Sequence, residues 1–273
     1  MPTRSPAQTG KRHTTAIVTL LTDFGMRDAY VGIMKGVILG IAPQARLVDL
    51  THEVPAQDVT AGALLLRSAI EFFPPGTIHV AVVDPGVGSE RRPLLVVTER
   101  GVLVGPDNGL LHPAAVACGL RELRVLDRAE RFRRPVSRTF HGRDVFAPVA
   151  AHLACGTPPA ELGSPATGMV ELPLPAPRRD GGVVHGEVIY VDRFGNLVTN
   201  IPAAELASFP AQNLSVNVAG VSGIPIASSY AAAPEGALLA ITGSWGLIEV
   251  AVRNGSAAQR LGAGRGAAVS LGN

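Results

Sequence analysis

Two polar segments in the first half of the chain carry side chains that together could activate a water molecule. The glycine-rich segment Asp84–Arg92 holds a carboxylate at Asp84 and a guanidinium at Arg91. A second segment, Phe140–Asp144, holds the imidazole of His141. A carboxylate or an imidazole can accept a proton, whereas a guanidinium stays protonated and only donates hydrogen bonds. If the fold brings these groups together, they would orient and polarise a water for hydrolysis.

Each of these residues also has a structural interpretation. Asp84 and Arg91 could form an ion pair across their own loop, and His141 could be a satisfied turn histidine. Asp23, in an earlier polar turn, could cap the helix that follows it or accept two hydrogen bonds from a sugar diol. The segment Asp84–Arg92 is not a phosphate-binding P-loop, because it lacks the Gly-Lys-Ser/Thr ending and precedes a strand rather than a helix.

The elements that must position these residues alternate between strands and helices. Apolar, β-branched runs predict strands, and apolar residues at helical spacing predict helices. The expected strands are Ala16–Leu21, Arg46–Leu50, Thr77–Val83, Leu94–Thr98 and Val102–Val104, the last two as a hairpin, and the expected helices are Asp28–Ile41, Val59–Phe73 and Val145–Cys155. This alternation predicts an α/β domain with a largely parallel central sheet. Ligands of such sheets bind at the carboxyl ends of the strands, where the polar segments fall.

The second part of the chain has a different texture. Residues Glu171–Pro177 are rich in proline, and the polar, glycine-rich Arg178–Gly182 is typical of a linker. Short strand-like runs then dominate: Val183–Val191, Leu197–Ile201, Leu214–Val218, Ala237–Thr242 and Leu247–Val252. We therefore expect an N-terminal α/β domain over residues 14–177 and a smaller, β-rich, barrel-like C-terminal domain over residues 183–273.

Composition limits the classes of partner. A net charge of +2 over 273 residues gives no electrostatic basis for binding nucleic acid, and no apolar run approaches the length of a membrane span. The histidines lack the spacing of metal ligands, so no metal is expected. We interpret Cys118 and Cys155 as buried free thiols, which suits a reducing cytoplasm. The polar stretch Met1–His13 is expected to be a disordered leader and not a signal peptide.

The same loops resemble those of a known family, the S-adenosyl-L-methionine (SAM) hydroxide adenosyltransferases, which are adenosine-forming SAM hydrolases related to the SAM-dependent fluorinase and chlorinase. The matching stretches keep the family's order across most of residues 16–257. They are LLTDFGMRDAYVGIMKG, VDLTHEVPAQDVTAGA, VAVVDPGVGSERRPL, VGPDNGLL, RTFHGRDVFAPVAAHLA, VDRFGNLVTNI and GSWGLIEVAVRNGSA. The DPGVGSERR and FHGRD motifs are long and unusual, which makes a chance match a poor explanation.

The resemblance implies a function and a set of site residues. SAM would be the substrate, with no separate cofactor, and an in-line attack of water at the ribose C5′ would release L-methionine and adenosine. Asp84, Arg91 and His141 would handle the water, and Asp23 would bind the ribose. The resemblance leaves open whether Asp84 or His141 accepts the proton.

Further contacts follow from the same resemblance. The family is a homotrimer that holds SAM between the first domain of one subunit and the second domain of its neighbour. The amino and carboxylate groups of the methionine moiety would meet Asp192 and Ser244, and Asn196 would contact the adenine. The remaining residues expected to line the pocket are Asp28, Tyr30, Gln57, Asn108, Phe140 and Gly142.

Departures from the halogenating relatives favour water over a halide ion as the nucleophile. Those relatives carry a hydroxyl-bearing, tyrosine-containing loop where this chain has Asp84–Gly88, and a serine where Gly142 stands. A carboxylate at Asp84 would repel a halide and favour a hydrogen-bonded water. Trp245 stands where the fluorinase has an arginine beside Ser244. A halide-using transferase and a SAM- or adenosine-binding sensor without turnover are the alternatives.

Overall fold

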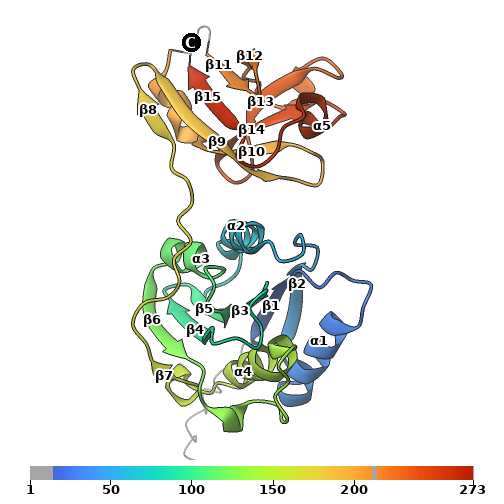
Figure 1. Ribbon diagram of the computed structural model, residues 1–273, viewed down its shortest axis with the longest axis vertical. Helices are drawn as coiled ribbons and strands as arrows, with labels where there is room; N and C mark the ends of the chain where they lie inside the picture. The colour runs from blue at the N-terminus through green and yellow to red at the C-terminus, as the bar shows by residue number, and fades with distance from the viewer. Residues whose placement is uncertain (1–14, 211–213, 273) are drawn as a thin grey trace, which may run out of the picture. The chain divides into compact units, whose positions relative to one another are not determined.

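The computed structural model describes residues 15–210 and 214–272, and its chain forms two compact units (Figure 1). The first unit ends at Leu172 and the second begins at Pro173. The expected leader Met1–His13 lies outside the described residues. Within the described part of the chain, no helix is long and apolar enough to cross a membrane.

Unit 1 is built around a mixed sheet with the strand order β2-β1-β3-β5-β4-β6-β7. Its strands are β1 (Ile17–Thr22), β2 (Arg46–Thr51), β3 (Thr77–Val82), β4 (Pro93–Thr98), β5 (Gly101–Pro106), β6 (Leu120–Val125) and β7 (Ser164–Pro165). Neighbours from β2 to β5 run parallel, whereas β4 pairs antiparallel with β5 and with β6, and β6 with β7. The predicted parallel sheet is therefore confirmed where it carries the polar loops, and it ends in an antiparallel edge.

Helices cover both faces of this sheet (Figure 1). One face carries α1 (Tyr30–Ile41) and α4 (Ala147–Ala154), and the other carries α2 (Val59–Ile70) and α3 (His112–Ala117). The α1–α4 face encloses an apolar core that includes Leu20, Met34 and Phe146, all fully buried. Because these side chains pack on the sheet from a helix or the strand itself, the ends of the strands are held rigidly.

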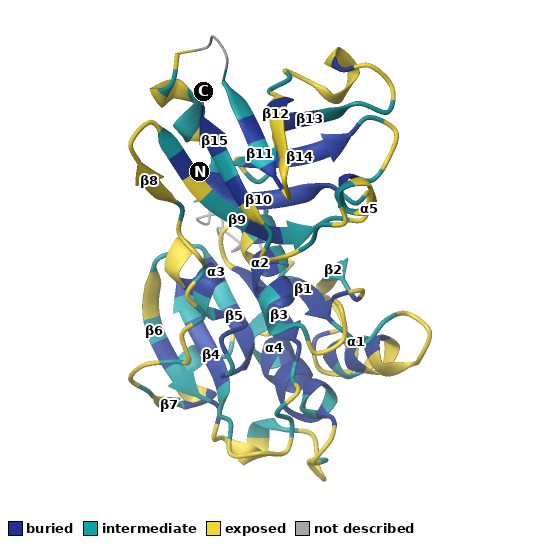
Figure 2. Ribbon diagram, turned by 45° about the horizontal axis from the view of Figure 1, so that its top comes forward, coloured by how far each residue is buried: buried dark blue, intermediate teal, exposed yellow. Residues whose placement is uncertain are grey.

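Strand β3 lies at the centre of unit 1. All six of its residues are buried, as its nearly all apolar sequence predicts for a strand covered on both faces (Figure 2). Its register with β1 sets Thr22 opposite Val82. The loops that follow β1 and β3 therefore start at the same sheet edge, and these loops contain Asp23 and Asp84.

Unit 2 is a barrel-like sheet with the order β12-β11-β15-β9-β10-β14-β13, in which β8 also pairs with β9. Its strands are β8 (Arg178–Asp180), β9 (Val183–Val191), β10 (Leu197–Pro202), β11 (Ser215–Val218), β12 (Val221–Pro225), β13 (Leu238–Thr242), β14 (Leu247–Val252) and β15 (Ala268–Gly272). A bridge from Ile226, just past β12, to Ala240 on β13 joins the two ends of the order and nearly closes the barrel. Helix α5 (Ala257–Leu261) is capped by the hydroxyl of Ser256.

Shorter helical turns complete the chain. They are the 3₁₀ turns η1 (Ala129–Arg131), η3 (Pro159–Glu161), η4 (Ala203–Ser208) and η5 (Tyr230–Ala232), and the π-helical turn η2 (Gly142–Phe146). The turn η2 leads directly into α4, so the helix predicted over Val145–Cys155 begins as a π-helix several residues earlier.

Two expectations about this part of the structure are corrected. Arg178–Asp180 forms strand β8 against β9 rather than a linker. The pairing uses backbone groups, so the polar side chains of this segment do not prevent it. Cys118 is a buried free thiol as expected, but Cys155 is exposed. Cys155 follows the last residue of α4, where the helix ends and turns into solvent at Gly156.

Candidate active site

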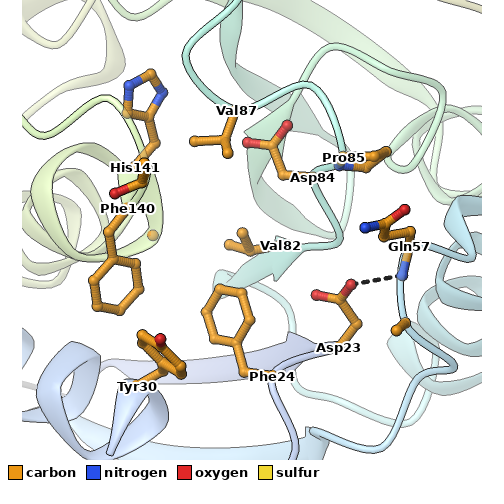
Figure 3. Close-up of a pocket in the computed structure, with 13 residues that line it drawn as sticks. Asp23, Phe24, Tyr30, Gln57, Val82, Asp84, Pro85, Val87, Phe140 and His141 are labelled. Carbon is orange, nitrogen blue, oxygen red and sulfur yellow. Dashed lines mark hydrogen bonds between the residues drawn. The ribbon is translucent and has the colours of Figure 1, made fainter.

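A pocket of about 390 Å³ lies in unit 1 at the edge where β1 and β3 end (Figure 3). Its lining residues come from the loops that follow these two strands, from the segment before α2 and from the segment that enters η2. They are Asp23, Phe24, Tyr30, Ala56, Gln57, Val82, Asp84, Pro85, Val87, Thr139, Phe140, His141 and Gly142. Pockets of this size hold small organic ligands.

Arg91 joins the two candidate proton acceptors. Its Nε donates to Asp84 Oδ1 at 2.9 Å, and its Nη2 forms a second, short contact with Asp84 Oδ2. The same Nη2 lies 2.7 Å from Nδ1 of His141. The side chains of Arg91 and Asp84 are only 8% and 5% exposed. The ion pair expected as the structural alternative is thus also the contact that holds the candidate catalytic residues together.

This contact fixes the protonation of His141. Because a guanidinium can only donate, Nδ1 of His141 must accept, so the ring is neutral with its proton on Nε2. Burial and the positive charge of Arg91 lower the pKa of His141, and the carboxylates of Asp84 and Asp144 and a hydrogen bond with the Ser137 backbone only partly oppose this. Both effects keep His141 uncharged near neutral pH.

Two close contacts hold the loops that carry these residues. Gly88 has a positive φ of 80°, and a Cβ atom there would lie 2.4 Å from the carbonyl oxygen of Arg138. Only glycine allows the loop after β3 to approach the segment before His141 so closely. In that segment Asp144, which is fully buried, accepts hydrogen bonds from the Ser137 amide and from the guanidinium of Arg143.

Asp23 faces the pocket from the loop after β1. It does not cap α1, whose N-cap residue is Ala29 without a side-chain hydrogen bond. Instead Oδ2 of Asp23 accepts from the amide of Gln57 at 2.8 Å. Gln57 adopts a left-handed backbone with φ of 64°, which is uncommon for a residue other than glycine. The other oxygen, Oδ1, accepts no hydrogen bond from the described residues.

Three aromatic rings gather at one end of the pocket (Figure 3). The ring centroids of Phe24 and Tyr30 are 5.7 Å apart, and that of Phe140 lies 5.2 Å from Tyr30 and 5.7 Å from Phe24. Their tilted and edge-to-face arrangement is the favourable one for aromatic groups. Together they form an apolar wall opposite the polar end that holds Asp84 and His141.

The structure places most but not all of the predicted residues at this pocket. Asp28 is exposed and does not line it. Asn108 does not line it either, because its amide donates to the carbonyl of Val83 at 2.8 Å and so fixes the backbone just before Asp84. Arg91 does not line the pocket itself, but it contacts Asp84 and His141, which do.

Three predicted residues lie in unit 2. Asp192 organises the turn between β9 and β10, where Oδ1 accepts from the amides of Phe194 and Asn196 and Oδ2 accepts from the side chain of Asn196. Ser244 is exposed on the turn between β13 and β14. The neighbouring Trp245 stacks on Tyr190 with ring centroids 5.3 Å apart.

Several lining residues were not predicted. Val82, Pro85 and Val87 contribute apolar surface next to Asp84, and Ala56 and Thr139 each precede a predicted residue. The only available signal was their position within the polar loops, because an apolar side chain beside a catalytic one has no distinctive pattern. No group of three or more His, Cys, Asp or Glu side chains that could hold a metal ion occurs within residues 15–210 and 214–272.

Comparison with known proteins identifies the family. Residues 18–163 match the SAM hydroxide adenosyltransferase N-terminal domain, and residues 186–270 match the SAM hydroxide adenosyltransferase C-terminal domain. The chain is 43% identical over 251 residues to the (R)-S-adenosyl-L-methionine hydrolase of Salinispora arenicola, covering 90% of this chain and 94% of the relative. A more distant relative, the fluorinase of Actinoplanes, is 28% identical over 217 residues, covering 70% of this chain and 73% of that enzyme.

The fold agrees with the sequence matches. The crystal structure of an uncharacterized conserved protein from Thermotoga maritima superposes with a TM-score of 0.89 at 36% identity, covering 94% of this chain and all of that one. Both domains of the family are matched in order, and they account for most of the chain. The chain therefore belongs to the SAM hydroxide adenosyltransferase family.

Proposed function

We propose that this protein hydrolyses S-adenosyl-L-methionine to adenosine and L-methionine. The observation that carries the proposal is the pair Asp84 and His141, which line one pocket while Arg91 bonds to both. The family assignment and the 43% identity to a SAM hydrolase support the same substrate and reaction.

The reaction is an in-line displacement at the ribose C5′. A lone pair of the water oxygen forms the new C5′–O bond while the C5′–S bond breaks and its electron pair moves to sulfur. L-Methionine leaves as a neutral thioether, so its departure needs no acid. One proton of the water must be taken up by the protein, and the rest of the rate enhancement comes from alignment and from excluding competing water.

We infer that Asp84 accepts this proton. In the arrangement described, Nδ1 of His141 already accepts from Arg91, and Nε2 carries the ring proton, so neither nitrogen has a free lone pair. Each carboxylate oxygen of Asp84 has a further lone pair besides the one directed at Arg91. Nη1 of Arg91 is buried and has no hydrogen-bond partner among the described residues, and an ordered water would satisfy it.

Asp23 and the aromatic wall would hold the nucleoside. Oδ1 of Asp23 would accept from the ribose hydroxyls, with Oδ2 kept in place by Gln57. We further propose a homotrimer in which Asp192, Ser244 and Asn196 of a neighbouring subunit complete the site, with the first two at the methionine moiety and Asn196 at the adenine.

A halide is disfavoured as the nucleophile. The carboxylate of Asp84 lines the pocket where an anion would have to enter, and like charges repel each other more in a partly buried site than in water. Gly142 leaves no hydroxyl at its position, and a Cβ there would lie 3.1 Å from the sulfur of Met34 and 3.2 Å from the Phe140 ring. A serine at Gly142 would thus require both neighbours to shift.

Isotope labelling tests the reaction. Purified protein is incubated with SAM in ¹⁸O-labelled water, and the products are separated by mass spectrometry. The expected result is adenosine carrying one ¹⁸O together with unlabelled methionine. Tight binding of SAM without product would show a sensor instead, and formation of 5′-halo-adenosine with added chloride or fluoride would show a halide-using transferase.

A further inference from the structure

A chain of polar groups, buried at Thr22 and His52 and partly exposed at Asp49 and Lys35, lies behind the loop that carries Asp23. The hydroxyl of Thr22 is 2.8 Å from Nδ1 of His52, and Nε2 of His52 is 3.0 Å from Oδ1 of Asp49. The other oxygen of Asp49 accepts from Nζ of Lys35 at 2.6 Å. The chain therefore joins the end of β1 to β2 and to α1.

The direction of each contact follows from the types of group. Nε2 of His52 makes no well-aligned hydrogen bond among the described residues, but the carboxylate oxygen of Asp49 3.0 Å away favours a proton on this nitrogen. Burial alone would raise the pKa of Asp49, but the hydrogen bond from Lys35 and the close contact with His52 outweigh it and lower the pKa. In the neutral ring Nδ1 is then an acceptor, and the hydroxyl of Thr22 donates to it.

This order of acid, imidazole and hydroxyl resembles a nucleophilic triad, but the hydroxyl cannot act as one. Thr22 is fully buried, His52 is 4% exposed, and neither residue lines the pocket. Instead the Thr22 oxygen also accepts from the amide of Phe24 at 3.2 Å, so both of its hydrogen bonds lie inside the protein.

The same histidine holds the loop a second time through its backbone. The carbonyl of His52 accepts from the amide of Gly25 at 2.7 Å. The loop between Thr22 and Gly25 is thus tied to His52 at both ends, and the two residues between them, Asp23 and Phe24, are those that face the pocket.

We propose that Thr22 and His52, supported by Asp49, are positioning residues that fix the Asp23 carboxylate for recognition of the ribose hydroxyls. The proposal rests on the proposed function, because it assigns the ligand of Asp23. The proposal predicts that the network affects the preference for ligands with ribose hydroxyls over ligands without them. A network that served only to stabilise the fold would leave this preference unchanged.

The chain contains a matched control in the same strand. Thr19, also on β1, hydrogen-bonds through its hydroxyl to Nδ1 of His79 at 2.8 Å, and both residues are buried. Neither Thr19 nor His79 lines the pocket. Thr19→Val and Thr22→Val therefore each remove a threonine–histidine hydrogen bond between buried residues. Only the bond removed by Thr22→Val lies beside the Asp23 loop.

The experiment compares binding of adenosine and of 2′,3′-dideoxyadenosine by calorimetry in wild type, Thr22→Val and Thr19→Val. In Thr22→Val the preference for adenosine should fall about 10-fold, as expected for weakening one well-placed hydrogen bond, and KM for SAM should rise by a similar factor while kcat stays within about 3-fold. In Thr19→Val the preference should equal that of wild type. Equal preferences in all three proteins would overturn the proposal.

A second variant covers the case in which Thr22→Val does not fold. Asp49 is partly exposed, and Asp49→Ala removes the outer support of His52 without opening the core. It should lower the preference for adenosine by a smaller factor than Thr22→Val does, and an unchanged preference would contradict the proposal.

If wild type hydrolyses SAM but no variant changes the preference for adenosine, only the positioning role fails. If wild type neither binds adenosine nor consumes SAM, the proposed function fails with it.

Discussion

At the scale of single residues, Arg91 determines the chemistry of its neighbours. It pairs with the carboxylate of Asp84, holds His141 in one tautomer and places its guanidinium carbon 5.5 Å from the centre of the Phe146 ring. A lysine could not replace it, because a single ammonium group cannot reproduce the two-pronged contact with the carboxylate. The spacing of Asp84 and Arg91 in the sequence allowed this pair, but the third partner comes from a distant segment.

Two substitutions separate the roles of Asp84 and His141. His141→Asn keeps an acceptor oxygen near the position of Nδ1, so Arg91 stays in place, and kcat should fall by no more than about 10-fold. Asp84→Asn removes the proton acceptor, and kcat should fall by about 10³-fold, within the range for loss of a general base. A third substitution, His141→Ala, leaves Arg91 without this partner and should lower kcat further than His141→Asn does.

Steady-state kinetics with SAM measure both effects, and circular dichroism shows whether each variant is folded. A folded His141→Asn protein as inactive as Asp84→Asn would mean that the imidazole takes the proton.

His79 predicts how stability depends on pH. Burial lowers its pKa from 6.5 to about 4, so between these values the unfolded chain binds a proton that the native protein does not. The free energy of unfolding should therefore decrease as the pH falls from 6.5 towards 4, by about 2–3 kcal/mol at pH 4.5. In His79→Gln this residue no longer titrates, and the decrease on acidification should be smaller by that amount.

Urea unfolding at pH 7.5 and pH 4.5 measures the difference. The exposed His185 provides the comparison, and His185→Gln should leave the pH dependence close to that of wild type. The same slope in His79→Gln and wild type would show that His79 is protonated in the native state.

Residue types pointed to Asp23, Asp84, Arg91 and His141, and the family resemblance added the other candidates. Asp23, Asp84, His141, Gln57 and Phe140 all line the pocket of unit 1, and their roles toward a substrate stay predictions. Asn108 was predicted to line the pocket too, but its side chain turns to a backbone carbonyl that only the folded loop brings near. His52 and Asp144 could not be found by pattern, because their importance depends on which backbone amides and hydroxyls surround them in space.

At the scale of elements, two loops from different parts of the chain form the polar end of the pocket. The loop after β3 and the segment before η2 touch at Gly88 and Arg138. A substitution that separates these two segments should affect catalysis although it changes no catalytic side chain, since displacements of about 1 Å can lower rates strongly.

Gly88→Ala tests this coupling. A Cβ at this position would lie 2.4 Å from the Arg138 carbonyl oxygen, so the loop must move and pull Asp84 away from His141. We expect kcat to fall by about 10²-fold. Gly76→Ala is the control, because Gly76 has a similar φ of 86° but nothing within 4 Å of an added Cβ. In both variants the strained backbone should lower the free energy of unfolding by about 1 kcal/mol. Only Gly88→Ala should also lose activity.

Thermal unfolding and kinetics measured on the same samples distinguish the two effects. Equal activity of the two variants would show that the contact at Arg138 does not position the catalytic residues.

Helices and strands were predicted correctly where apolar side chains recur with the spacing of a helix or form the apolar run of a buried strand. The apolar run of β3 and the helical spacing of α1 were read correctly. Strands β6, with the sequence LRELRV, and β12, with VSGIP, were missed, because partly exposed strands keep charged or small residues and form through backbone pairing. The short helix α3 was missed because six residues contain too few turns to show a period.

At the scale of the whole molecule, each unit has its own apolar core. One core surrounds Leu20, Met34 and Phe146, and the other surrounds Leu197, Ile201 and Leu271. The change in composition along the chain predicted this division into an α/β part and a β-rich part. No feature of the sequence gives the number of subunits, because subunit contacts depend on surfaces that patterns of core residues do not describe.

The proposed trimer makes a quantitative prediction about mixed assemblies. Asp84→Asn disables the first domain of a site and Asp192→Ala the second, and each variant alone should be inactive. When the two chains are co-expressed in equal amounts, a site receives an intact first domain and an intact second domain with a probability of ½ × ½, so activity should recover to about one quarter of wild type. Activity measured on co-purified assemblies tests this, and no recovery would mean that both domains of a site come from one chain.

The π-helical turn Gly142–Phe146 has a consequence for the family's evolution. Such a turn holds one residue more than an α-helix of the same length, so it behaves as a tolerated insertion. Deleting one residue here would leave α4 intact but rotate the preceding His141 and Phe140 by about 100° around the helix axis. We therefore expect relatives that retain this site also to retain the extra residue, and an alignment gap within these five positions should mark a lineage with a different site.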